Sequence, residues 1–190
     1  MDILDTLTSK EKSLLLINRY KEGTRICIQG DECHYVYYVL EGEIKIISNE
    51  GVTYNYVKEK KMFGNNLLFS SNPRYKGNVI ANKDTTLYLF NKKTLIYLLQ
   101  NNIEFLLEYL KIQGDFGKEL NDEIKLLSLN NVEDRLLFYM NKNKGIIKYK
   151  NITSLSKTLL VSREALSRTI TKLVNNKIII KDKKIIKVIQ

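Results

Sequence analysis

Long hydrophobic runs are absent from this 190-residue sequence, and cysteine and histidine are scarce. No stretch approaches the roughly 18 to 20 consecutive apolar residues that span a bilayer, so we expect no membrane partner. The first five residues are acidic and lack the basic and apolar regions of a signal peptide. With 44% hydrophobic and 27% charged residues, the composition is typical of a globular protein. We therefore expect the protein to be cytoplasmic.

The scarcity of thiols and imidazoles limits metal and redox chemistry. Cys27 and Cys33 form a Cys-x5-Cys pair, which is not a usual zinc spacing, and two thiols cannot alone complete a tetrahedral site. A cytosolic setting favours ordinary reduced thiols over a metal or redox pair. The single histidine, His34, belongs to no Ser/His/Asp constellation, and no Walker-type phosphate loop is present. We predict no metal site, no cofactor and no enzymatic activity.

Acidic residues are scarce in the last third of the chain. Residues 131–190 contain 14 Lys/Arg and 4 Asp/Glu, whereas residues 1–130 contain 17 of each. The whole net charge of +10 therefore lies in the last third. A charged run is usually a solvated surface, but an excess over a whole segment favours a polyanionic partner, most commonly nucleic acid.

Short β-branched and aromatic runs alternate with turn residues from Gly23 to about Phe90. Glycines lie where turns would require a positive φ, at Gly30, Gly42 and Gly51. The spacing predicts an antiparallel barrel or sandwich, closed by a strand over residues 86–90.

Helical periodicity replaces the alternating pattern after residue 91. Residues 94–100 predict a short amphipathic helix, and Asn101 or Asn102 can cap the next one. A heptad pattern with alternating spacings of three and four then runs through Ile103, Leu106, Leu110, Gln113, Gly117, Leu120, Ile124 and Leu127. Such a narrow stripe favours a parallel dimer coiled coil over a helix that packs only on its own domain. Gln113 and Gly117 weaken its middle, since glycine in a helix interior costs about 1 kcal/mol.

The last 60 residues have the element order of a winged helix-turn-helix. Helices are predicted over 132–140, 152–160 and 162–175, and a hairpin over 177–181 and 184–189. Three residues would pack the first helix and turn of the motif, namely Leu155, Leu159 and Val161. Leu166, Ile170 and Leu173 give the second helix a buried stripe.

Polar side chains occupy the other face of that second helix, near its N-terminus. Arg163, Glu164, Ser167 and Arg168 lie where a recognition helix reaches base edges in the major groove. Arginine can bond guanine through O6 and N7, and glutamate can accept a hydrogen bond from cytosine N4. Ser162 at the N-cap could meet a phosphate. A surface ion pair between Arg163 and Glu164 is the alternative interpretation, but the motif and the charge favour DNA reading.

Further DNA contacts are expected around this helix. Sequence-independent attraction to phosphate would come from Lys172 and Lys183, with Lys177, Lys181 and Lys184 beside them. Thr153, at the start of the first helix of the motif, is a further candidate contact.

These segments together resemble the Crp/Fnr family over nearly the whole chain. Residues 23–26, 29–31, 37–42 and 63–64 resemble its cyclic-nucleotide-type β-roll, the heptad helix its dimer helix, and residues 161–168 its recognition helix. The resemblance implies an α+β fold with an N-terminal antiparallel β-roll sensor domain (1–100), a dimerisation helix (101–129) and a C-terminal winged helix-turn-helix domain (130–190). It also implies that Arg163, Glu164 and Arg168 of a homodimer read a palindrome of TGTGA-type half-sites in double-stranded DNA. RNA polymerase is a further partner if the protein activates transcription.

The sequence departs from the family pattern in the cyclic nucleotide pocket. Nucleotide-binding members use a Gly-Glu pair and an Arg-Ser or Arg-Thr pair to hold ribose and phosphate, but here Gly64 is followed by Asn65. The second pair falls on Tyr75 and Lys76, with Arg74 adjacent. The base-contacting positions of the dimer helix fall on Leu120 and Asn121. Because the lost carboxylate and arginine remove charge-assisted bonds, we expect no cyclic AMP binding, and these seven residues are the candidate effector region.

Several alternatives stay open at this stage. The chain could answer to another ligand, to oxidation of Cys27 or Cys33, or to nothing; an iron–sulfur cluster would need four thiols. It could instead be a sensor or interaction protein whose basic C-terminal region binds without sequence specificity. The family's usual glycine in the helix-turn-helix corner is replaced by Leu160, which would be strained at a positive φ.

Overall fold

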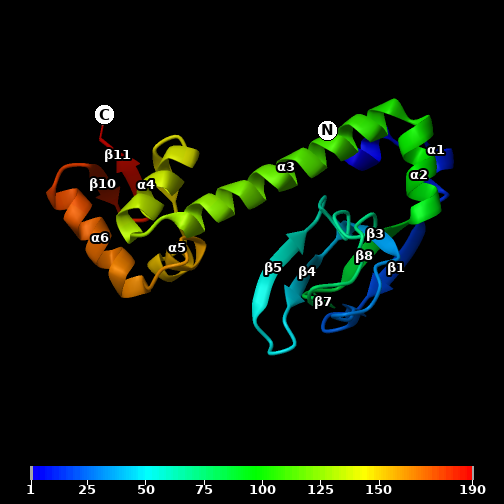
Figure 1. Ribbon diagram of the computed structural model, residues 1–190, viewed down its shortest axis with the longest axis horizontal. Helices are drawn as coiled ribbons and strands as arrows, with labels where there is room; N and C mark the ends of the chain where they lie inside the picture. Colours follow the sequence, from blue (N-terminus) through cyan, green and yellow to red (C-terminus); the bar gives the residue numbers. More distant parts are fainter. Residues whose placement is uncertain (1, 190) are drawn as a thin grey trace. The chain divides into compact units, whose positions relative to one another are not determined.

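The computed structural model describes residues 2–189, and the chain forms two units that meet between Asp115 and Phe116. This boundary falls inside the longest helix, α3 (Ile103–Ser128). Figure 1 follows the chain through both units. The elements of the first unit before α3 are η1 (Ile3–Thr6), α1 (Ser9–Lys12), β1 (Leu16–Tyr20), β2 (Arg25–Cys27), β3 (Tyr35–Glu41), β4 (Glu43–Ile47), β5 (Thr53–Lys58), β6 (Met62–Phe63), β7 (Asn78–Ala81), β8 (Thr85–Asn91) and α2 (Lys92–Asn101).

The strands of the first unit form two antiparallel sheets, with strand orders β1-β8-β3-β6 and β2-β7-β4-β5 (Figure 1). The predicted antiparallel β-roll is therefore confirmed, and the predicted closing strand is β8. The turn between β3 and β4 needs glycine, because Gly42 has φ +90° and a Cβ there would meet the carbonyl oxygen of Asp84. Strand β1 was not predicted from the sequence. Its exposed Leu16 and Ile17 lie on an edge strand and lack the apolar–polar alternation that would have indicated it.

The core of the first unit joins the roll to the helices that follow it. Leu95 and Leu98 of α2 and Phe105 of α3 are 0% exposed, and Tyr109 of α3 is 5% exposed. The Phe105 ring lies 6.0 Å from that of Phe90 in β8. The start of α3 is thus anchored in the core of the roll.

Asparagine caps fix where both helices begin. Asn91 Oδ1 accepts a hydrogen bond from the amide of Thr94 at 2.8 Å, which starts α2. Asn102 Oδ1 accepts one from the amide of Phe105 at 2.9 Å, which starts α3. The cap proposed from the sequence at Asn101 or Asn102 is therefore Asn102.

The second unit contains the C-terminal part of α3 and the remaining elements (Figure 1). These are α4 (Val132–Lys142), β9 (Ile146–Lys148), α5 (Ile152–Thr158), α6 (Arg163–Asn175), β10 (Ile179–Asp182) and β11 (Ile185–Val188). The predicted hairpin is present, and β9 extends it to a three-stranded antiparallel sheet of order β10-β11-β9. Strand β9 was missed because three residues are too few to show a period.

The core of the second unit follows the predicted apolar stripes. Leu155 is 3% and Leu159 0% exposed, and Leu166, Ile170 and Leu173 of α6 are 0 to 3% exposed. Val161, between the two helices, is partly buried against the same cluster. Within residues 2–189, no helix is both long and apolar enough to cross a membrane.

Candidate nucleic-acid interface and interior of the roll

Helix α6 presents a polar face opposite its buried stripe. Ser162 is its N-cap, and its hydroxyl oxygen accepts a hydrogen bond from the amide of Ala165 at 3.1 Å. The helix therefore begins at Arg163, whose side chain is exposed, as are those of Glu164, Ser167 and Arg168. Because leucines and isoleucine on the other face are buried, these four side chains cannot turn inward.

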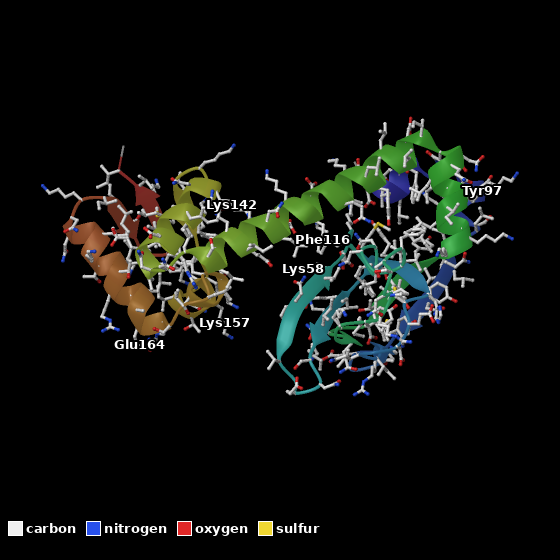
Figure 2. All side chains as sticks on the ribbon, in the orientation of Figure 1. Lys58, Tyr97, Phe116, Lys142, Lys157 and Glu164 are labelled. Atoms are coloured by element: carbon white, nitrogen blue, oxygen red, sulfur yellow. The ribbon has the colours of Figure 1, made fainter. Side chains whose placement is uncertain are left out.

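The same four residues line a shallow open hollow at the start of α6. Figure 2 shows Glu164 at this end of the helix. The ion pairs formed among residues 2–189 do not include Arg163, Glu164 or Arg168. The surface-pair interpretation of Arg163 and Glu164 therefore gains no support, and the charged groups remain available to a partner.

The other candidate DNA contacts differ in their surroundings. Lys172 of α6 is paired with Glu133 of α4 at 2.8 Å, so part of its charge is already compensated. Lys183 is exposed in the hairpin turn, where its φ is +47°. Thr153 is exposed in the first turn of α5, two residues after the N-cap Asn151.

The turn between α5 and α6 contains the strained residue expected from the sequence. Leu160 has φ +54° and a side chain that is 52% exposed. A leucine in this left-handed region costs roughly 1–2 kcal/mol relative to a right-handed one. Sequence reasoning missed the residue that contacts this turn, Arg135 of α4, whose Nη1 donates to the carbonyl oxygen of Leu160 at 2.9 Å. Nothing in the sequence distinguishes Arg135 from an ordinary surface arginine, because α4 and the α5–α6 turn come together only when the chain folds.

Aromatic rings and thiols fill the interior of the roll beside the candidate effector region. Tyr37 stacks on Phe63 with ring centroids 4.5 Å apart, and its hydroxyl lies 3.5 Å from that of Tyr75. Cys27 Sγ is 3.6 Å from the Tyr37 hydroxyl. Cys33 is buried as well, and its Sγ lies 3.3 Å from the carbonyl oxygen of Tyr35.

Burial sets the protonation of this cluster. It raises the pKa of both thiols above their ordinary value, and the pKa values of Tyr37 and Tyr75 are raised for the same reason. All four groups are therefore neutral at physiological pH. Tyr75 stands at the position where the family resemblance led us to expect a phosphate-binding residue. A phosphate there would need a cationic partner, but Tyr75 supplies a neutral, buried hydroxyl.

The candidate effector residue Asn65 is turned toward helix α3. Its Nδ2 donates to Gln113 Oε1 at 2.8 Å, and its carbonyl oxygen accepts from Gln113 Nε2 at 3.2 Å. Gln113 Nε2 also donates to the Tyr109 hydroxyl at 3.0 Å. Asn65 is 8% exposed, so the amide that replaces the family's carboxylate is already bonded within the protein.

The remaining effector candidates differ in their surroundings. Arg74 is exposed and its Nη1 donates to the carbonyl oxygen of Gly30 at 2.8 Å, while Lys76 is exposed. Gly64 is buried with φ +78°, and a Cβ there would lie 2.8 Å from the carbonyl oxygen of Tyr35. Leu120 and Asn121 belong to the second unit and are exposed.

The heptad residues divide into exposed and half-buried positions. In the first unit Ile103 is 65% and Leu110 55% exposed, but Leu106 and Gln113 are half-buried. Leu107, which was outside the predicted seam, is 60% exposed. In the second unit the exposed fractions of the predicted seam residues are 42% for Leu120, 63% for Ile124 and 55% for Leu127, and Gly117 is half-buried. Exposed apolar side chains thus repeat along α3, with Leu107 exposed in place of the predicted Leu106, while Gln113 bonds to the roll.

No group of three or more histidine, cysteine or carboxylate side chains within residues 2–189 is arranged to hold a metal ion.

Comparison with known proteins shows which domains and folds these units resemble. Residues 17–102 match the model of the cyclic nucleotide-binding domain family. A search of curated protein sequences found no significant match. Among solved structures, the chain is similar to a CooA mutant from Carboxydothermus hydrogenoformans, with 16% identity over 99% of this chain and 90% of that one and a TM-score of 0.68.

Two further structures extend the comparison. The Thermus thermophilus catabolite activator protein shares 19% identity over 100% of this chain and 94% of its own, with a TM-score of 0.58. A transcriptional regulator from Thermotoga maritima shares 24% identity over 63% of this chain and 95% of its own, also with a TM-score of 0.58. Residues 17–102 thus resemble a cyclic nucleotide-binding domain, and the chain has the fold of these transcription regulators. The predicted resemblance to the Crp/Fnr family is confirmed at the level of the fold.

Proposed function

We propose that the protein is a transcription regulator that binds double-stranded DNA as a homodimer, at a palindrome of TGTGA-type half-sites. One observation carries the proposal: Arg163, Glu164, Ser167 and Arg168 share one exposed face at the start of α6, held outward by a fully buried opposite face. In a winged helix-turn-helix this is the face that enters the major groove. The +10 charge of residues 131–190 supplies the attraction to phosphate.

Dimer formation in this proposal uses the exposed apolar side chains of α3. Ile103, Leu107 and Leu110 in its first half, and Ile124 and Leu127 in its second, are each at least 55% exposed. Exposed leucines and isoleucines repeating along one helix are typical of a coiled-coil seam. Two copies of α6 would then read two half-sites related by a two-fold axis.

Cyclic AMP does not control the protein in this proposal. The Asn65 amide is engaged by Gln113, and the neutral Tyr75 hydroxyl lies beside Tyr37 in the roll interior. Neither group supplies the charge that a cyclic phosphate or a ribose hydroxyl pair would need. We expect 1 mM cyclic AMP to leave both the melting temperature and the DNA affinity unchanged. A rise of several degrees in the melting temperature would contradict this part of the proposal.

Sequence-specific binding is tested by gel mobility shift on a palindrome of TGTGA half-sites, with a scrambled palindrome as the control. Arg163→Ala should reduce discrimination at one base pair of each half-site by about 1–3 kcal/mol. Lys183→Ala is the matched control from the hairpin turn, and it should weaken binding to specific and scrambled DNA by the same factor. Undiminished base preference in Arg163→Ala would exclude the proposed recognition face. Equal binding of the wild type to both DNAs would favour a basic surface without sequence specificity.

A further inference from the structure

The guanidinium of Arg135 joins two segments of the second unit. Its Nε donates to the carbonyl oxygen of Leu129 at 3.1 Å, and its Nη2 donates to that of Leu127 at 3.2 Å. Its Nη1 donates to the carbonyl oxygens of Leu160 at 2.9 Å and Leu159 at 3.4 Å. One side chain from α4 therefore binds the C-terminal end of α3 on one side and the turn between α5 and α6 on the other.

These acceptors need a partner for physical reasons. The last carbonyl groups of a helix accept no hydrogen bond from an N–H group of the same helix. They also form the negative end of the helix dipole, which a nearby cation stabilises. Leu160, in its left-handed conformation, leaves its own carbonyl outside both helices. Only arginine offers several N–H donors in a rigid planar fork, so lysine could not hold both segments in one geometry.

Other contacts fix the end of α3 to α4 but do not reach the turn. Lys142 Nζ lies 2.9 Å from Asp122 Oδ2, and Lys125 Nζ lies 5.2 Å from the centre of the Phe138 ring. Leu126 of α3 is 6% exposed in the core of the unit. Arg135 thus adds to this joint a direct hydrogen-bonded connection to the residue two positions before the N-cap Ser162 of α6.

We propose that Arg135 is a positioning residue that holds the α5–α6 turn at a set orientation to the end of α3. This inference rests on the proposed function, in which α3 joins two copies and α6 reads DNA. The two helices share the core of the unit, and the guanidinium of Arg135 adds a direct hydrogen-bonded connection between the end of the dimer helix and the turn before the recognition helix. Through this connection Arg135 sets the distance between the two reading surfaces. It therefore determines the half-site spacing that the dimer accepts, while touching no base.

The binding test compares palindromes whose spacers are shortened or lengthened by one or two base pairs with a DNA that carries a single half-site. The wild type should bind one spacing preferentially. Arg135→Gln and Arg135→Lys should lower the ratio between the best and the altered spacings roughly tenfold, since several hydrogen bonds to a charged group are lost or weakened. Their affinity for the single half-site should stay within about twofold of wild type, because the α6 face is unchanged. Lys142→Gln, which breaks the Asp122 pair without touching the turn, should keep the wild-type spacing preference.

A second measurement needs no DNA. In Arg135→Gln, amide hydrogen exchange should accelerate in residues 159–162 and 128–131, while exchange in the core of α6 stays at the wild-type rate. Unchanged exchange in both segments, or an unchanged spacing preference in the folded variant, would overturn the inference. Equal loss of binding to the half-site and to all palindromes would also overturn it. If exchange accelerates in Arg135→Gln but the wild type prefers no palindrome, the proposed function is refuted, whereas the role of Arg135 in holding the α5–α6 turn to the end of α3 is supported.

Discussion

Helix α3 contains two glycines whose replacement by alanine has an expected sign. A Cβ added at Gly114 or at Gly117 would meet no atom within 4 Å, and both residues lie inside a continuous helix, Ile103–Ser128. Glycine is about 1 kcal/mol less favourable than alanine in a helix interior. The double variant should therefore gain about 2 kcal/mol in its free energy of unfolding. For a chain of this length that corresponds to a rise of roughly 4–8 °C in melting temperature.

Circular dichroism at 222 nm, with thermal and urea unfolding at one fixed protein concentration, measures this change. Gly42→Ala provides a control of opposite sign, because its Cβ would lie 2.7 Å from Thr85 Oγ1 at a φ of +90°. A loss of stability in Gly114→Ala or Gly117→Ala would refute the reasoning. It would show that a second helix approaches these glycines more closely than a methyl group allows.

The remaining predictions concern the interior thiols, a helix cap and a carboxylate. Because burial raises the pKa of Cys27 and Cys33, both should react with Ellman's reagent at pH 8 much more slowly than free cysteine, and rapidly in denaturant; fast reaction of the native protein would contradict their packing. Asn91→Ala should lower the free energy of unfolding by about 1–2 kcal/mol, since the cap of α2 is lost, whereas Asn91→Asp keeps the accepting oxygen and should retain most of it; equal losses in urea unfolding would exclude the cap. The Thr8 amide lowers the pKa of Glu11 below its usual 4.5, so its contribution is present at neutral pH and disappears as the pH falls through the lowered pKa. Glu11→Gln should therefore reduce the acid-induced loss of stability below about pH 4.5, and an unchanged pH profile would contradict that contribution.

Periodicity explains which parts of the fold could be predicted from the sequence. The stripe of Leu166, Ile170 and Leu173 predicted both the existence of α6 and the side that it buries, because an apolar stripe must face a core. The same stripe left Arg163 and Glu164 on the exposed face, so the candidate reading surface followed directly. Short or irregular segments gave no such signal, which is why β1 and β9 were missed.

The interior of the roll could be predicted only in part. The sequence indicated that Asn65 and Tyr75 lack the charges of a nucleotide pocket, since residue identity alone decides charge. It could not show that Asn65 is bonded to Gln113, or that Tyr75 lies beside Tyr37, because those pairs are 48 and 38 residues apart along the chain. The heptad pattern likewise placed Gln113 in a dimer seam, whereas in the structure its amide bonds to the roll.

The sequence by itself determined the charge asymmetry, the exposed face of α6 and the strained position of Leu160, because each depends on residue type and local periodicity. Tertiary structure alone decided which hydrogen-bond partners are found by the polar groups that have none within their own helix or turn. Arg135 is the clearest example: its sequence context is that of any helical surface arginine, yet folding brings carbonyl groups from two segments to one guanidinium. Hydrogen-bond partners far apart in sequence are set by packing, and packing is a property of the whole unit.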